Sequence, residues 1–114
     1  MAVSKFASGS RMFAADRNTS NTTTGVARGL YDVATGCVRI NFYATHTANI
    51  GTNSPMFNVP SQYRPSSTVA GSCVAFNSAG APTVGRCKID STGNLYQIEV
   101  ATTRQVYGYI EYRL

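Results

Sequence analysis

The chain has 114 residues and a formal net charge of +5, and its charged residues make up only 13% of the sequence. This length predicts a single domain. The basic residues are scattered and form no block of like charge, so the concentrated basic face of a nucleic-acid-binding protein is not expected. No stretch approaches the roughly 18 apolar residues of a membrane span, and insertion into a membrane is not expected either.

Residues 1–25 are expected to form an N-terminal segment and a polar loop, partly extended or flexible. The stretch 18–25 is built from Asn, Thr, Ser and Gly and offers no apolar side chain to a core, which is typical of a loop. The domain proper is therefore expected over residues 26–114.

From residue 26 onward, apolar side chains recur with a period of two, the pattern of half-buried strands. Runs 26–33 and 37–45 flank a turn at Gly36 and predict a hairpin with one apolar and one polar face. A loop is expected over 46–55, before a short extended run that ends at Val59.

The second half continues the pattern. Runs 69–77 and 83–88 predict a hairpin. In the next turn, Gly93 is expected in the left-handed conformation and Asp90 as an acceptor of turn hydrogen bonds. The final run, 106–114, again alternates. About seven strands with turn signals every eight to twelve residues predict an all-β fold, an antiparallel sandwich or jelly roll.

The three cysteines form an odd set without C-x-x-C spacing, so they predict neither a disulfide framework nor a zinc site and favour assembly in a reducing cytoplasm. If Asn77 pairs with Thr83, Cys73 lies opposite Cys87, where a disulfide is geometrically possible but strained. Two reduced, buried thiols are the favoured interpretation.

Pro60 and Pro65 enclose the sequence Gln62-Tyr63-Arg64. Each proline lacks a backbone donor, so the segment is expected to form a rigid corner instead of a ladder strand. Within it, the ring of Tyr63 is expected to pack on the sheet and the guanidinium of Arg64 to cap carbonyl groups.

Residues 59–66, Val-Pro-Ser-Gln-Tyr-Arg-Pro-Ser, resemble the leucine-proline, any, glycine, tyrosine-arginine-proline-serine turn of C-terminal head domains in bacteriophage tail fibres and receptor-binding proteins. Val59 and Gln62 stand where that family has leucine and glycine. Those heads continue with a strand pair, a short hairpin like 89–95 and a tyrosine-rich final strand like 106–114. The resemblance thus covers about residues 38–114.

This resemblance implies a β-sandwich head domain that assembles as a homotrimer, with Pro60, Tyr63, Arg64 and Pro65 as its structural signature. It implies a protein of the virion tail, assembled in the bacterial cytoplasm, that contacts other phage tail proteins and recognises a host cell-surface saccharide or protein. One alternative is a decoration or tail-tip protein that binds only other phage proteins. Another is a monomeric carbohydrate-binding module of a bacterial enzyme.

Neither catalysis nor a cofactor is expected. The sequence contains no G-x-S-x-G, H-E-x-x-H or phosphate-loop motif. Its five acidic residues are dispersed, and no local spacing supplies the carboxylate pair of a glycosidase. His46 is expected in an exposed loop, and no metal site is expected, apart from the minor alternative of three copies of His46 around a threefold axis.

Tyrosine rings stack on sugars, and their hydroxyls add hydrogen bonds. The ligand-binding candidates are therefore tyrosines and nearby polar residues: Tyr43, Tyr96, Tyr107, Tyr109, His46, Asn49 and Arg104. Tyr107 and Tyr109 alternate onto one face of the last strand, where a subunit interface is the competing role. Val106, Ile110 and Tyr112 are expected to seal the threefold interface.

Overall fold

The computed structural model describes residues 9–50, 54–77, 79–98 and 103–114, and for 47–50, 103 and 104 it describes the backbone alone. These described residues form nine strands and a 3-10 turn, η1, between β5 and β6. The elements are β1 (Ser10–Ala14), β2 (Asp16–Arg17), β3 (Thr22–Asp32), β4 (Cys37–Ile50), β5 (Pro55–Asn58), η1 (Ser61–Tyr63), β6 (Val69–Phe76), β7 (Pro82–Ile89), β8 (Asn94–Ile98) and β9 (Thr103–Arg113).

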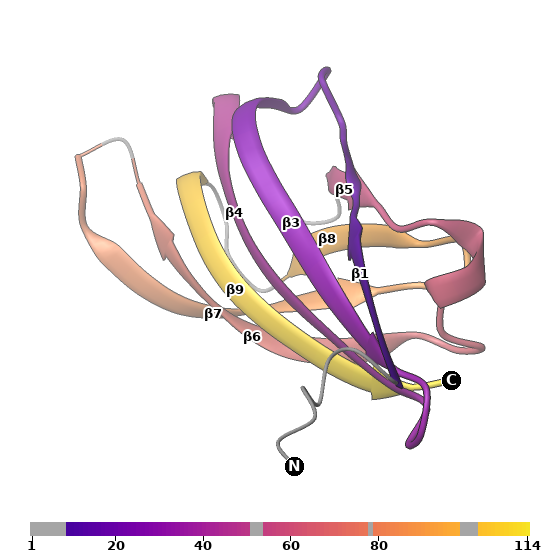
Figure 1. Cartoon of the computed structure of the whole chain (residues 1–114). Coiled ribbons are helices and arrows are strands. Elements are labelled where there is room, and N and C mark those ends of the chain that lie inside the picture. The colour runs from indigo at the N-terminus through magenta and orange to yellow at the C-terminus, as the bar shows by residue number, and fades with distance from the viewer. Residues whose placement is uncertain (1–8, 51–53, 78, 99–102) are drawn as a thin grey trace, which may run out of the picture.

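All pairings are antiparallel, which confirms the predicted all-β class. The strands form one sheet in the order β1-β3-β4-β9-β6-β7-β8-β5-β2. In Figure 1, β3, β4 and β9 run side by side as a curved layer, and β5 and β8 run across the right of the view, near β1. In the part described, no helix is long and apolar enough to cross a membrane.

The first and last strands of this order belong to one continuous segment, residues 10–17. β1 pairs with β3 at one edge of the sheet, and β2 pairs with β5 at the other. Between them, the backbone N–H of Ala15 donates to the carbonyl of Ala27 at 2.9 Å. The segment therefore closes the sheet into a barrel-like sandwich, which leaves its edges paired.

This closure corrects the expected boundary at residue 26, since β1, β2 and the first residues of β3 all precede it and belong to the same sheet. Polar side chains hold the stretch 18–25 by local hydrogen bonds. The side chain of Asn18 accepts from the backbone N–H of Ser20 at 3.0 Å, and Thr22 Oγ1 donates to the Asn18 carbonyl at 2.7 Å. Such side-chain to backbone bonds replace the apolar contacts that the sequence lacks here.

Strand β4 is longer than predicted. His46 pairs with Thr22 of β3 and lies in β4, which corrects the expected loop over 46–55. Of the other expected loop residues, 47–50 continue β4, and 51–53 lie outside the described residues. Both His46 and Thr22 are buried, so the strand extends because a second layer covers this end of the sheet.

The register of the β6–β7 hairpin also differs from the prediction. Phe76 pairs with Pro82, which places Cys73 opposite Gly85 and not opposite Cys87. The reason is Asn77, which turns out of the strand: its Oδ1 accepts from the backbone N–H groups of Ala79 and Ala81 at 2.9 and 3.0 Å. Both thiols are buried and free.

The core is formed by the inward-facing residues of each strand. It includes Val106, Ile110 and Tyr112, which are at most 6% exposed. These three side chains therefore belong to the interior of the single chain, which corrects their expected place at a threefold interface. The sequence correctly predicted which side chains of β9 share its apolar face. That face, however, packs against the core of the same chain.

The proline corner is confirmed in both expected roles. The Tyr63 ring stacks on Phe13, with centroids 4.3 Å apart and planes 11° apart. Arg64 Nε donates to the carbonyl of Val59 at 2.8 Å and Nη2 to Asn58 Oδ1 at 2.9 Å. Gln62 lies within η1, a conformation with φ near −60° that does not require the family's glycine.

The β7–β8 turn packs against the proline corner. Gly93 has φ +86°, as predicted, and the side chain of Asp90 accepts from the backbone N–H groups of Thr92 and Asn94. A Cβ at position 93 would overlap Arg64 Nε and lie 2.7 Å from the Val59 carbonyl oxygen. Gly93 therefore provides both the backbone conformation and the room for the guanidinium.

Gly93→Ala is expected to lower the free energy of unfolding by about 2 to 4 kcal/mol, because the new methyl group adds a clash to left-handed strain. Gly80→Ala is the matched control. Gly80 has a similar φ of +81°, but among the described residues no atom outside 79–81 lies within 4 Å of the point that a Cβ would occupy there. Gly80→Ala should therefore cost about 1 kcal/mol. Urea unfolding measures both; equal losses would contradict the role of the Arg64 contact.

Thiol accessibility provides a second test. Burial raises the pKa of Cys73 and raises the pKa of Cys87 to about 12, so both remain protonated and shielded at pH 8. Cys37 is partly exposed. A disulfide-exchange reagent should label one thiol quickly in the native protein and all three cysteines in urea. Rapid labelling of two or three thiols without denaturant would contradict this packing.

Candidate functional site

The most exposed aromatic side chains gather on the outer face, defined here as the outward-pointing residues of β3, β4, β9, β6 and β7. Strand pairing arranges these residues in rows across the five strands, each row about 19 Å long at the usual strand spacing. The apolar row contains Val26, Tyr43, Tyr107, Val74 and Val84; the polar row beside it contains Arg28, Asn41, Tyr109, Ser72 and Arg86.

The aromatic rings in these rows are supported from the side and open to solvent. Tyr43 and Tyr107 stack with their centroids 6.0 Å apart and their planes 23° apart, and Phe76 meets the Tyr107 ring edge-on at 6.0 Å. Tyr43, Tyr107 and Tyr109 are 43%, 49% and 41% exposed. These rings therefore present large amphipathic surfaces in fixed positions, as binding sites for sugars and proteins commonly do.

Two shallow grooves meet on the β3–β4 side of the outer face. The first, of about 430 Å³, is lined by Val26, Arg28, Asn41, Phe42, Tyr43 and Tyr107. The second, of about 420 Å³, is lined by Met12, Arg28, Gly29, Leu30, Arg39, Asn41 and Tyr109. Arg28 and Asn41 line both grooves and pair across the two strands. The first groove thus combines two tyrosine rings with one guanidinium and an amide, and the second combines one tyrosine ring with two guanidinium groups and the same amide.

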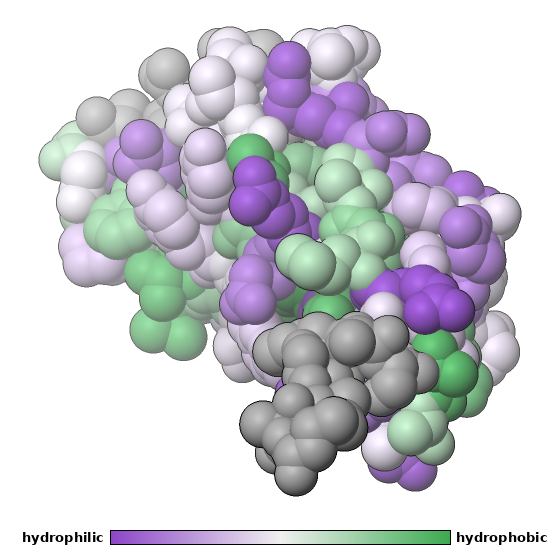
Figure 2. Space-filling view, viewed as in Figure 1, coloured by the Kyte–Doolittle hydropathy of each residue, from purple (hydrophilic) through white to green (hydrophobic). Residues whose placement is uncertain are grey.

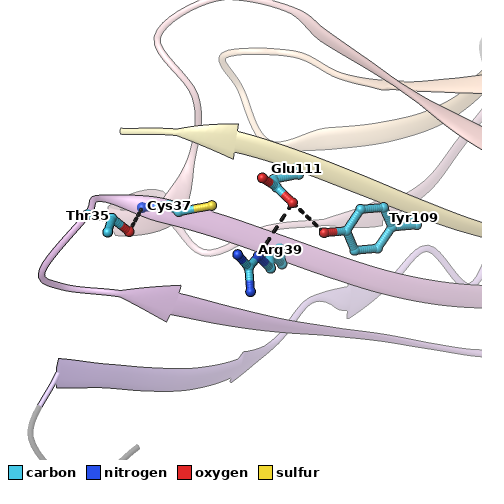
Figure 3. Close-up of polar contacts among 5 residues, drawn as sticks. All are labelled: Thr35, Cys37, Arg39, Tyr109 and Glu111. Carbon is cyan, nitrogen blue, oxygen red and sulfur yellow. Dashed lines mark hydrogen bonds and ion pairs between the residues drawn. The ribbon is translucent and has the colours of Figure 1, made fainter. Parts of the chain in front are cut away.

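A polar network borders the second groove, on β4 and β9 (Figure 3). Tyr109 Oη donates to Glu111 Oε1 at 2.5 Å, and Arg39 Nε lies 3.4 Å from the same oxygen. The hydroxyl of Tyr109 and the nearby guanidinium lower the pKa of Glu111, and the bond to Glu111 raises the pKa of Tyr109. The network fixes the orientation of the Tyr109 ring, and it already engages Oε1 of the Glu111 carboxylate.

A third hollow, of about 370 Å³, lies on β6, β7 and β9. Its lining is mostly apolar and contains no charged side chain: Ser72, Cys73, Val74, Val84, Tyr107, Gly108 and Tyr109. Val84 is 82% exposed. Figure 2 shows hydrophobic residues gathered at the left of the molecule, where β6 and β7 run in Figure 1. The outer face is thus polar and aromatic on β3 and β4, whereas on β6 and β7 an apolar hollow lies beside the polar row that ends at Arg86.

Three of the predicted ligand-binding residues, Tyr43, Tyr107 and Tyr109, come together on this face. Tyr96 and His46 do not join them. Tyr96 lies on β8, where its hydroxyl bonds to Asp90 Oδ2 at 3.0 Å and Lys88 Nζ lies 5.1 Å from its ring centroid.

His46 is 1% exposed, which corrects its expected place in an exposed loop. Its Nε2 lies 3.3 Å from Oε1 of Gln97, which is equally buried. This pair provides a polar contact inside the barrel and is closed to a large ligand. The side chains of Asn49 and Arg104 lie outside the described residues, as strand positions in β4 and β9.

Among the described residues, no group of three or more His, Cys, Asp or Glu side chains is arranged to hold a metal ion. The residues that sequence reasoning missed are Arg28 and Asn41 in the grooves, and Val74 and Val84 on the apolar side. Each lies at an outward position of a correctly predicted strand. The missing information was the order of the strands, because β9 inserts between β4 and β6.

In the comparisons with known proteins, no family model matches this chain, and no curated protein matches it.

Tyr109→Phe is expected to raise the pKa of the Glu111 carboxyl towards its usual value, because the hydroxyl that stabilises the carboxylate is removed. An NMR titration of the side-chain carboxyl carbons measures the shift. Tyr107→Phe removes a neighbouring hydroxyl that has no bond to Glu111 and should leave the Glu111 titration unchanged. Equal titration curves for the two variants would contradict the network.

Proposed function

We propose that the chain is a non-enzymatic receptor-binding module of a phage or prophage tail, and that a host cell-surface saccharide or protein binds across its outer face. The observation that supports this most is the set of three exposed tyrosines beside the hydrogen-bonding side chains of Arg28 and Asn41. Stacking surfaces next to polar groups are what a sugar or a mixed protein surface requires. The proline corner adds the resemblance to tail-fibre heads.

We place the contact between copies of the chain on the β6–β7 side of the same face. Val74 and Val84 are exposed there without a charged neighbour in the hollow between them, and an apolar patch of this kind is typical of a subunit interface. In a homotrimer, the β3–β4 grooves of three copies would be displayed together. Weak binding at each groove would then gain strength by multivalency.

The same apolar side favours a second candidate, a decoration or tail-tip protein that binds only other phage proteins. In that role the outer face would be covered by tail subunits. The two candidates differ in what the purified protein retains. A receptor-binding module retains host cells or surface glycans, whereas the structural protein joins purified tails and retains neither.

Replacing Tyr43 and Tyr107 together by Ala should weaken binding to host cells or to a glycan array about tenfold or more, because the stacking surface of each ring is lost. Both residues are exposed, so the fold should persist, and circular dichroism checks it. Tyr96→Phe is the control, because it alters a tyrosine away from the grooves. Unchanged binding by the double variant would place the ligand elsewhere.

Oligomer formation is checked in the same preparations by light scattering. Val84→Lys should shift a trimer to a monomer of 12.2 kDa, because a buried unpaired charge is costly at an interface. A wild-type protein that is monomeric at all concentrations would count against the trimer and favour a carbohydrate-binding module.

A further inference from the structure

We infer that the ligand of the outer face is an anionic saccharide, whose carboxylate or phosphate group is bound by Arg28 where the two grooves meet. This rests on the proposed function and goes further by naming the class of ligand. The inference comes from the charges around the grooves and from the hydrogen bonds that their arginines make.

Arg28 is an exposed guanidinium without a partner in the described part of the chain: it makes no hydrogen bond or ion pair there. Other arginines are engaged. Arg39 lies against Glu111, Arg64 donates to the Val59 carbonyl, and Arg17 donates to the Thr22 carbonyl at 2.6 Å. The planar fork of Arg28 therefore remains available for the bidentate bond that guanidinium forms with carboxylate and phosphate groups.

The surroundings of Arg28 suit a negative ligand. No Asp or Glu is among the described residues that line either groove. The nearby carboxylate, Glu111, already accepts from Tyr109 and faces Arg39, so its charge is largely compensated. The net charge of +5 attracts anions to the whole molecule.

The positions of the tyrosine rings indicate that the anionic group belongs to a saccharide and is not a small free anion. Tyr43 and Tyr107 line the first groove, Tyr109 lines the second, and Arg28 with Asn41 lies in both. A small free anion would contact Arg28 but leave the rings unused. A chain of sugar rings can stack in both grooves while its anionic group meets Arg28 and a hydroxyl meets Asn41.

The test uses an array of bacterial surface polysaccharides grouped as neutral, carboxylate-bearing and phosphate-bearing, probed with the full chain. The expected result is retention of acidic members in preference to neutral ones, and weaker retention at high salt. Each retained carboxylate glycan is then tested as its methyl ester, which keeps the sugar rings and removes the charge. Binding should fall about tenfold or more. Comparing the phosphate-bearing with the carboxylate-bearing polysaccharides of the array shows which of the two anionic groups the protein binds.

Three variants locate the effect. Arg28→Gln should lose about tenfold or more for the acidic glycan and little for its ester, and Arg28→Lys should fall between Gln and wild type, because Lys keeps the charge without the fork. Arg11→Gln is the control, since Arg11 is also exposed but lines neither groove. It should change binding less than twofold.

The outcomes separate the two proposals. If acids and esters bind alike and Arg28→Gln changes neither, the anionic class is overturned and the receptor-binding function stands. If Arg11→Gln weakens binding as much as Arg28→Gln, attraction is diffuse and the Arg28 site is overturned. If wild type retains no glycan and no host cell, the receptor-binding function fails, and the inference fails with it.

Discussion

The closure of the sheet by residues 10–17 is the constraint on which the rest of the structure depends. β1 and β2 pair with opposite edges, so the sheet must curl until one short segment reaches both. Phe13 secures this arrangement, because its ring stacks on Tyr63 and covers Gly29, where a side chain would overlap it. An open sheet of the same strands would expose two edges and would lose this curvature.

The closure also links the proline corner to the strand that carries the candidate site. Tyr112 of β9 donates its hydroxyl to the carbonyl of Tyr63, so β9 is attached to the corner that Phe13 covers. Along the same strand, side chains alternate between the two faces. Fixing the inward side chain of Tyr112 therefore fixes the direction in which Tyr107 and Tyr109 point outward.

The sequence predicted those features whose causes are local. Period-two alternation indicated the β3–β4 hairpin, and glycine with aspartate indicated the turn at Gly93. Features with distant causes were missed. The inclusion of Phe13 depends on Tyr63, fifty residues away along the chain, and the burial of His46 depends on Gln97. The three tyrosines were identified, but Arg28 gained significance only when strand pairing placed it between two grooves.

The different roles of the two faces bear on function. The inward residues form a continuous core, and the outer rings contribute less to folding because each remains at least 41% exposed. Folding of the single chain gains only the modest stabilisation of cross-strand pairs from these exposed rings, through the stacking of Tyr43 on Tyr107 and the bond from Tyr109 to Glu111. Arg28 likewise stabilises no carbonyl or carboxylate in the described residues. Exposed aromatic rings beside an unpaired guanidinium are features that a binding partner can use. The outer face is for this reason the proposed binding surface.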